Sequence, residues 1–207
     1  MFWRITTVLL TLILATVVLS TSLFQAVSIR YAFSQEPALS QSSNTVEIDY
    51  KLSFPGRVLP GSLLWPIKAT RDKVWMLLTT DPGKKAELNL LFADKRIWGA
   101  KILFEKEEFE TGMSTLAKAE KYLEEAARLS ARNKSKGLEV SEFSERLAKA
   151  SLKHWQTVGE ILNLAPEDAR PEIIKIQNYS IESYKSARDS LQSLGLTAPI
   201  NPFEANQ

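Results

Sequence analysis

Residues 81–110 read DPGKKAELNLLFADKRIWGAKILFEKEEFE, and this stretch decides the fold. Asp81 can accept hydrogen bonds from the free N–H groups of a first helical turn, and Pro82 is tolerated at the first helical position. Apolar residues then recur at steps of four and three, which places them on one face of a helix. They are Ala86, Leu90, Ala93, Ile97, Ala100 and Phe104. Further apolar residues widen this face, so we expect a central helix packed on more than one side.

Four more helical patterns surround this stretch. They cover residues 66–79, 114–136, 141–164 and 171–194, each with apolar residues at helical spacing and a capping, Gly or Pro signal at an end. The connections between them are short, and no strand pattern alternates with the helices. The sequence therefore predicts an all-α fold, an up-and-down bundle of about four to five helices.

A Pro- and Gly-rich segment precedes the first of these helices. The stretch YKLSFPGRVLPGSLLWPIK at residues 50–68 has prolines at three positions and glycines after two of them, which excludes a continuous helix. Its Leu, Phe, Val and Trp residues make it too apolar to hang free in water. We expect it to lie along the helices as a strap.

The amino-terminal end carries a membrane signal. Ile5–Ile29 contains no charged residue, and as a helix it would span about 37 Å against about 30 Å of bilayer hydrocarbon. We favour a retained signal anchor that holds the chain in the membrane through residues 5–29. The alternative is a signal peptide cleaved near Ser34, after which the protein is secreted.

The order of these segments predicts the placement of the chain. Only four residues precede the uncharged stretch, and a long globular part follows it, which favours a single-pass membrane protein with an extracytoplasmic domain. We divide the chain into an anchor (1–30), a flexible stalk (31–46), a helical domain (47–195) and a disordered tail (196–207).

Charge and composition exclude several classes of function. The 26 basic and 24 acidic residues leave residues 31–207 with no net charge, and no stripe of Lys and Arg marks a nucleic-acid surface. We therefore expect no nucleic-acid partner. The absence of Cys excludes disulfides, thiolate metal sites and a Cys nucleophile.

Part of the chain resembles a known family. The lead Tyr50-x-Leu-x-Phe-Pro-Gly56, the run Asp-Pro-Gly-Lys-Lys-Ala-Glu-Leu at 81–88 and the following Ala-Asp-Lys-Arg96 are similar to the motifs of the bacterial extracytoplasmic family called domain of unknown function 5667. The resemblance covers roughly residues 48–127. It implies a domain held outside the membrane by a single span, and it brings no activity, cofactor or catalytic residue with it.

The charged residues of the first two helices have two interpretations. They could line a ligand site, or they could join the helices through salt bridges, and exposed charge pairs of this kind are common in helical proteins. We favour a structural ion-pair network of Arg71, Glu87, Asp94 and Arg96 that fixes the register of two helices.

The residue types and motifs that usually mark a catalytic or metal site do not predict one in this sequence. His154 is the only histidine and lies on the apolar side of its helix, where a half-buried imidazole with satisfied hydrogen bonds is commoner than a ligand or a base. No nucleophile elbow, P-loop or dinucleotide glycine motif is present. We name no catalytic, metal-binding or cofactor-binding residue, and we expect no enzyme activity and no cofactor.

Three functions stay open at this point. We favour a non-catalytic protein-interaction or structural module of the bacterial cell envelope, whose protein partner the sequence does not name. The alternative is a cell-wall or small-ligand binding module with an apolar pocket under the strap, in which tryptophans stack on sugars. An enzyme would need two or more perturbed carboxylates converging in one cleft.

Overall fold

The computed structural model describes residues 48–204 of the chain. The predicted anchor and stalk and the last three residues lie outside this range. In it the elements are, in chain order, α2 (Trp65–Leu78), α3 (Pro82–Glu105), α4 (Phe109–Ser135), α5 (Ser141–Leu164), the 3-10 turn η1 (Glu167–Ala169) and α6 (Arg170–Ser193). The predicted all-α fold is confirmed, since this part of the chain contains helices and no strand. None of the described helices is both long and apolar enough to cross a bilayer.

Helix α3 begins at the predicted cap, Asp81, and ends at Glu105, five residues before the end of the stretch 81–110. The carboxylate of Asp81 accepts a hydrogen bond from the backbone N–H of Lys84 at 2.7 Å, so Asp81 is the N-cap of α3. At the other end Glu107 has a φ of 61°, and the N–H of Glu108 donates to the carbonyl of Leu103 at 2.9 Å. This is the left-handed C-terminal turn that usually contains glycine, and a glutamate in its place gives no sequence signal.

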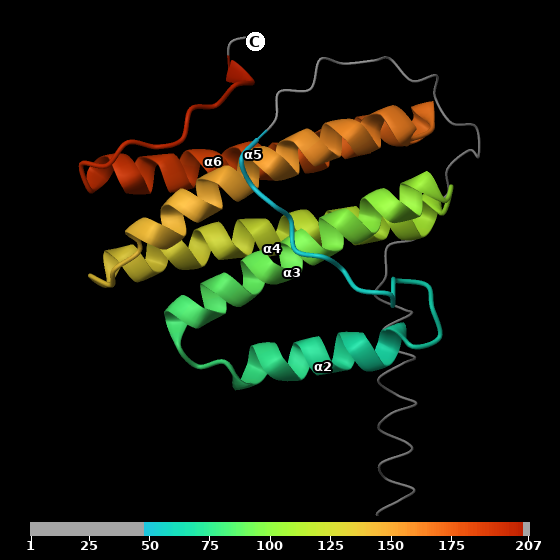
Figure 1. The fold of residues 1–207 in the computed structure, drawn as a ribbon, viewed down its shortest axis with the longest axis horizontal. Coiled ribbons are helices and arrows are strands. Elements are labelled where there is room, and N and C mark those ends of the chain that lie inside the picture. Colours follow the sequence, from blue (N-terminus) through green and yellow to red (C-terminus); the bar gives the residue numbers. More distant parts are fainter. Residues whose placement is uncertain (1–47, 205–207) are drawn as a thin grey trace, which may run out of the picture. The chain divides into compact units, whose positions relative to one another are not determined.

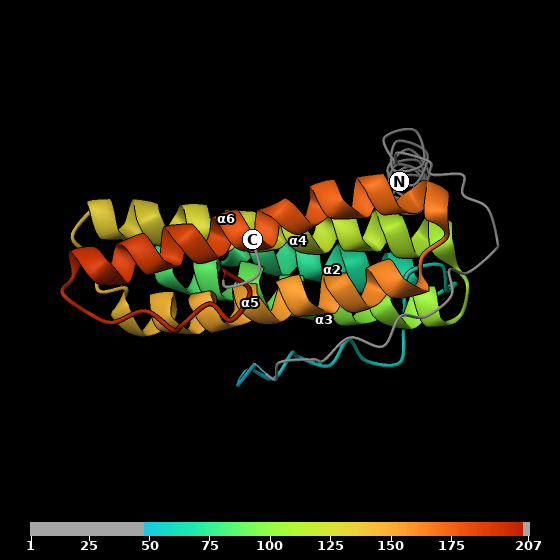
Figure 2. The same ribbon diagram turned by 90° about the horizontal axis from the view of Figure 1, so that it is seen from above.

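The helices form layers (Figures 1 and 2). Helix α3 packs on α4 and α5 packs on α6, and the two pairs are stacked through α3 on α5 and α4 on α6. Helix α2 lies along the outer side of the α3 and α4 layer, with few close backbone contacts (Figure 1). Short connections reverse the chain between successive helices from α3 to α6, so these four form the up-and-down bundle.

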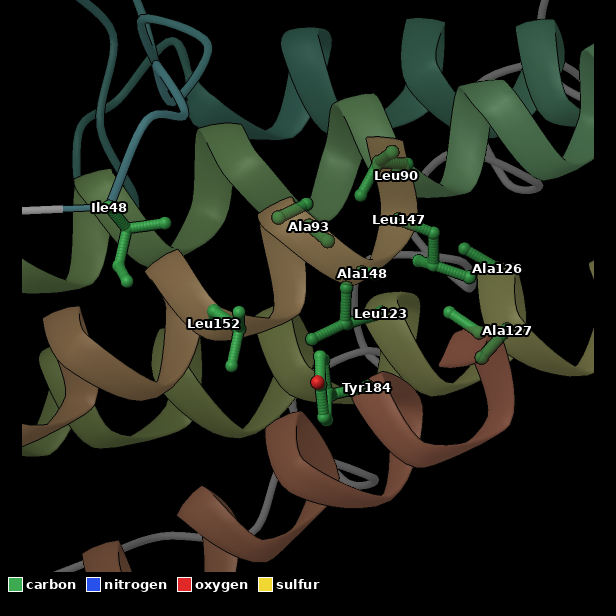
Figure 3. Packing of buried hydrophobic residues seen from close by; sticks show 12 residues of the cluster. Ile48, Leu90, Ala93, Leu123, Ala126, Ala127, Leu147, Ala148, Leu152 and Tyr184 are labelled. Atoms are coloured by element: carbon green, nitrogen blue, oxygen red, sulfur yellow. The ribbon is translucent and has the colours of Figure 1, made fainter. Parts of the chain in front are cut away.

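The core between these helices combines large aliphatic residues with many alanines. Figure 3 shows Leu90 and Ala93 of α3 with Leu147 and Ala148 of α5 around Leu123 of α4. Alanine at these interior positions lets the helix backbones approach closely, and leucines fill the remaining space. The predicted apolar face of α3 is therefore its core face, with Ala86, Leu90, Ala93, Ile97, Ala100 and Phe104 all buried.

The strap predicted at residues 50–68 has two parts in the structure. Residues 48–62 lie across α3 and are called the strap from here on, and Trp65–Lys68 form the first turn of α2. Ile48 contributes to the core, and the ring of Phe54 meets Trp98 edge to face with centroids 5.4 Å apart. The ammonium group of Lys68 on α2 donates to the carbonyls of Pro55 at 2.5 Å and Val58 at 2.8 Å. These bonds fasten the Pro-rich turn of the strap to α2.

The segment after α6 also packs on the bundle, in contrast to the disordered tail expected for residues 196–207. Tyr184 donates to the carbonyl of Pro199 at 2.7 Å, and the ring of Phe203 lies on Trp155 with centroids 4.1 Å apart. Asn201 is buried. Two prolines in a short segment suggested a loose end, but single aromatic contacts at long range have no periodic signature in the sequence.

A close approach at the turn between α3 and α4 depends on Gly112. A β-carbon at this position would lie 2.8 Å from Cδ2 of the buried Phe104, which is nearer than packed carbon atoms come. At Gly159 on α5, by contrast, the nearest atom would be Nε2 of Gln177 at 3.8 Å. The two helical glycines therefore differ in the space that a methyl group would find.

We predict that Gly112→Ala destabilises the chain by about 1–3 kcal/mol, because the added methyl group forces Phe104 from its packing site. Gly159→Ala is the control, and it should stabilise the chain by about 0.5–1 kcal/mol through the higher helix propensity of alanine. Urea-induced unfolding followed by circular dichroism measures both. Equal stabilisation by the two alanines would contradict the close packing at Gly112.

Candidate functional site

The centre of the bundle contains a buried histidine between two carboxylates. Nδ1 of His154 on α5 lies 2.7 Å from Oε1 of Glu120 on α4, and Nε2 lies 3.2 Å from Oδ1 of Asp94 on α3. The side chains of His154 and Glu120 are completely buried, and that of Asp94 is nearly so. We call Asp94, Glu120, His154 and the groups that hydrogen-bond to them, Tyr50, Ser53 and Ser180, the buried cluster.

The outer oxygens of the two carboxylates have partners from other elements. Oε2 of Glu120 accepts a hydrogen bond from Ser180 of α6 at 2.5 Å. Oδ2 of Asp94 accepts from the hydroxyl of Tyr50 at 2.9 Å and from the hydroxyl and backbone N–H of Ser53 at 3.3 and 3.4 Å. The cluster therefore connects the strap with all four helices of the bundle.

The geometry favours the protonated form of the imidazole. Both ring nitrogens face carboxylate oxygens, which only accept hydrogen bonds, and an imidazolium ion can donate to both at once. Burial alone would lower the pKa of His154, but the charge of Glu120, hydrogen bonds with both carboxylates and the charge of Asp94 outweigh it and raise the pKa to about 9. Burial and the adjacent charge of Asp94 also raise the pKa of Tyr50 far above its ordinary value.

In this arrangement the carboxylates, the imidazole and the hydroxyl groups are bonded to one another. A serine nucleophile would need its hydroxyl on a ring nitrogen of the histidine, whereas Ser180 donates to Glu120. Both nitrogens of His154 are already engaged by carboxylates. Within residues 48–204 no group of three or more Asp, Glu or His side chains is arranged to hold a metal ion.

The four residues predicted as one ion-pair network have separate partners. Arg71 pairs with its neighbour Asp72 at 2.7 Å, and Glu87 pairs with Arg146 of α5 at 2.9 Å. Asp94 belongs to the buried cluster. The structure therefore does not join these four residues in one network, and the cation that meets Asp94 is His154.

Arg96, the fourth of these residues, forms a second buried centre next to α2. Its guanidinium lies 4.4 Å from the ring centroid of Tyr122 and 5.3 Å from that of Phe92. Burial lowers its pKa, while the charge of the buried Asp72 on α2 acts in the opposite direction. Stacking on two aromatic faces and an anion on the neighbouring helix together stabilise this buried cation.

Sequence reasoning missed Glu120 as a partner of His154, and it missed Tyr50 and Ser180 as the donors to Asp94 and Glu120. The signal for Glu120 was its place on the apolar face of its helix, between Leu116 and Leu123. A carboxylate at such a position is almost never buried without a partner, so it calls for a cation elsewhere in the core. Which cation cannot be read from spacing, because the partner lies 34 residues away.

A groove lies on each side of the strap where it crosses α3. One has a volume of about 550 Å³ and is lined by Tyr50, Trp98, Lys101 and Lys153, among others. The other, of about 500 Å³, runs beside Tyr50 and Asp94 to Trp75, Glu87 and Arg146. Tyr50 lines both grooves and hydrogen-bonds to the buried cluster.

Little space remains under the Pro-rich part of the strap. The enclosed volume between residues 55–60, Trp65, Lys68 and Arg96 is about 10 Å³. This is room for about one water molecule. A larger ligand would therefore bind in the open grooves beside the strap.

The comparison with family models gives one result. The model described as Domain of unknown function (DUF5667) matches residues 57–168, which run from the strap through α5. This is more than half of the chain. The chain belongs to this family. Among curated proteins and among solved structures, no match is found.

The family match and the observed cluster overlap. The match begins just after the Tyr50–Gly56 motif and extends well beyond residue 127, where the resemblance read from the sequence ended. It includes Asp94, Glu120 and His154, the three charged residues of the buried cluster. Tyr50 and Ser180 lie outside the matched range.

We predict that the chain loses stability between pH 6.5 and 9. The pKa of His154 is higher in the folded chain than its ordinary value of 6.5, so the protonated group stabilises the fold fully below pH 6.5, and this contribution is lost as the pH rises through about 9. The loss should be on the order of 3 kcal/mol. Urea unfolding at a series of pH values measures it, and His154→Gln should remove this pH dependence.

The same titration can be observed directly, since His154 is the only histidine in the chain. Its imidazole nitrogen shifts in NMR spectra report a single, unambiguous pKa. A midpoint near or below 6.5 would contradict the charged form of the cluster.

We predict that Glu120→Gln destabilises the chain by about 1.5–3 kcal/mol, because it removes the nearer of the two carboxylates that bind the buried imidazolium and leaves only Asp94 as its anionic partner. Glu87→Gln is the matched control, since the pair of Glu87 with Arg146 is largely exposed, and its effect should be about 0–1 kcal/mol. Thermal and urea unfolding of both variants give the comparison. A small effect at Glu120 would show that the buried cluster is dispensable for the fold.

Proposed function

We propose that the chain is a membrane-tethered extracytoplasmic module of the bacterial cell envelope, without catalytic activity, that binds a protein partner. The observation that carries the proposal is that the members of the buried cluster are hydrogen-bonded to one another. The groups most suited to acid, base or nucleophilic chemistry bind one another and connect the four helices of the bundle with the strap.

The surface beside the strap supports the binding of a protein. The two grooves are open, shallow and lined by a mixture of charged, hydroxyl and aromatic side chains, and the strap separates them. An extended segment or a helix of a partner can follow such a surface and meet charges of both signs, among them Lys101, Glu160, Glu87 and Arg146. A small molecule usually needs a more enclosed site.

The uncharged stretch 5–29 supports the membrane tether, although it lies outside the described residues. The family resemblance supports an extracytoplasmic position. A stalk between this stretch and Ile48 would leave the grooves accessible to other envelope proteins.

One observation favours glycan binding as a second candidate. The indole of Trp75 is half exposed and lines the groove that also contains Glu87 and Arg146. An exposed indole beside charged hydrogen-bonding groups is a common arrangement for stacking on a sugar ring.

The tether and the binding surface can be tested in cells of the native host. We expect the chain to stay in the membrane fraction after carbonate extraction. A membrane-impermeant maleimide should label Lys175→Cys in intact cells, since this residue is exposed on α6 and the chain has no other thiol. Release of the chain by carbonate, or labelling only after lysis, would contradict the tether or the placement.

A photo-crosslinking residue at Lys51 or Lys84 then tests the grooves, with the same residue at Lys175 as the control. We expect one discrete protein adduct from a groove position and none from the control. The same adducts from all three positions would contradict a binding surface at the strap. Adducts to cell-wall glycan alone, lost on Trp75→Ala, would favour the second candidate.

A further inference from the structure

Helix α2 buries a carboxylate and exposes large apolar residues, whereas an ordinary surface helix buries its apolar face. Its inner side, which faces α3 and α4, carries the buried Asp72 together with Lys68 and Met76. The carboxylate of Asp72 binds Arg71, and its charge acts on the buried Arg96 of α3. The inner side of α2 thus combines a buried carboxylate with the partly buried Trp65, Lys68, Ala69 and Met76.

The side of α2 that is directed into water carries large apolar residues, with Thr70 and Arg71 between them. Ile67, Leu77 and Leu78 are 70%, 79% and 72% exposed, and Val74 and Trp75 are both 48% exposed. At 100° per residue these five side chains lie within an arc of roughly 160°. Leu63, just before the helix, is 97% exposed and extends the surface. We call Leu63, Ile67, Val74, Trp75, Leu77 and Leu78 the outer face of α2.

The surroundings of this face are cationic. Residues 48–85 contain seven Lys and Arg and three Asp and Glu, a net charge of +4, whereas residues 86–204 carry a net charge of −2. By helical position Lys73 lies on one flank of the outer face, and Arg71, whose side chain is 63% exposed, lies within it. Burial lowers the pKa of Lys118, and the charges of Arg96 and Lys73 lower it further.

A helix face with large apolar residues, a tryptophan at its margin and cations within and beside it is the pattern of a helix that lies in a membrane interface. The charge also argues against a second copy of the chain. A twofold interface would bring the same cations of both copies against each other. An anionic bilayer surface supplies both the apolar medium and the negative charge that this face requires.

We propose that the outer face of α2 docks on an anionic lipid bilayer and lays the helix in its interface. The docking proposal depends on the proposed function in one respect, namely that the chain is tethered to a membrane. The 18 residues between Ile29 and Ile48 could reach at most about 60 Å, so a chain anchored through residues 5–29 keeps α2 within range of the same membrane. Docking then fixes the orientation of the domain and directs the strap grooves relative to the membrane.

The chain has no cysteine, so single nitroxide labels can be placed on the full-length protein. Leu77→Cys reports on the outer face. Ile174→Cys on α6 is the matched control, an exposed apolar residue of another helix. Ser20→Cys lies in the uncharged stretch and reports on the anchor. The protein is reconstituted in phosphatidylcholine vesicles with and without phosphatidylglycerol, and the depth of each label is measured by its accessibility to oxygen and to a polar nickel complex.

We expect the Leu77 label to lie about 5–10 Å deep in vesicles that contain phosphatidylglycerol and to return to water in pure phosphatidylcholine. The Ile174 label should stay in water in both. A Leu77 label in water beside a buried Ser20 label would overturn the docking and leave the tether intact. A Ser20 label in water would contradict the tether, and the depth at Leu77 would still decide the docking.

A covering protein gives a different result. If a second copy covers the face, the Leu77 label is shielded in both kinds of vesicle, and pairs of labels broaden each other's spectra. Either observation would overturn the bilayer as the occupant. Circular dichroism of the labelled variants tests whether the fold is unchanged, which is expected because Leu77 and Ile174 are exposed.

Discussion

The contact of His154 with Glu120 and Asp94 is the interaction on which the bundle depends. Three ionisable side chains are buried together, and none of them could be buried alone without a large cost in desolvation. Their outer oxygens bind Ser180 and Tyr50, so a single hydrogen-bonded cluster joins α3, α4, α5, α6 and the strap. Apolar packing allows helices to slide and rotate by small amounts, whereas a cluster with this many directional bonds permits one register.

The cluster also explains why the strap lies where it does. Tyr50 and Ser53 complete the hydrogen bonding of Asp94, and Phe54 and Lys68 hold the next part of the segment against Trp98 and α2. The strap therefore covers the one carboxylate of the cluster that borders the surface, and the grooves lie on either side of it. A partner in either groove would touch Tyr50 and thus a residue bound directly to the centre of the bundle.

Two buried cations, His154 and Arg96, are stabilised by different partners. His154 is bonded to two carboxylates and joins helices of the bundle. Arg96 is held by aromatic rings and by the charge of Asp72, the buried carboxylate of α2. Five large apolar residues of α2 are exposed on its opposite side. The groove lined by Trp98 and Lys101 contains no residue of α2, whereas the other groove shares Trp75 with the outer face of α2. Binding a partner in the first groove is therefore compatible with docking on a membrane.

The sequence by itself determined the all-α fold, the place and cap of the central helix and the membership in a family, because helical periodicity, an Asp-Pro start and short motifs are local properties of the chain. It also showed that Ile67, Val74, Leu77 and Leu78 share one side of α2. Only the tertiary structure decided that this side faces water, that Glu120 is the partner of His154, and that residues 196–204 pack on α5 and α6. These outcomes depend on contacts between residues far apart in the chain, and a periodic pattern specifies which residues share a face but not what that face will meet.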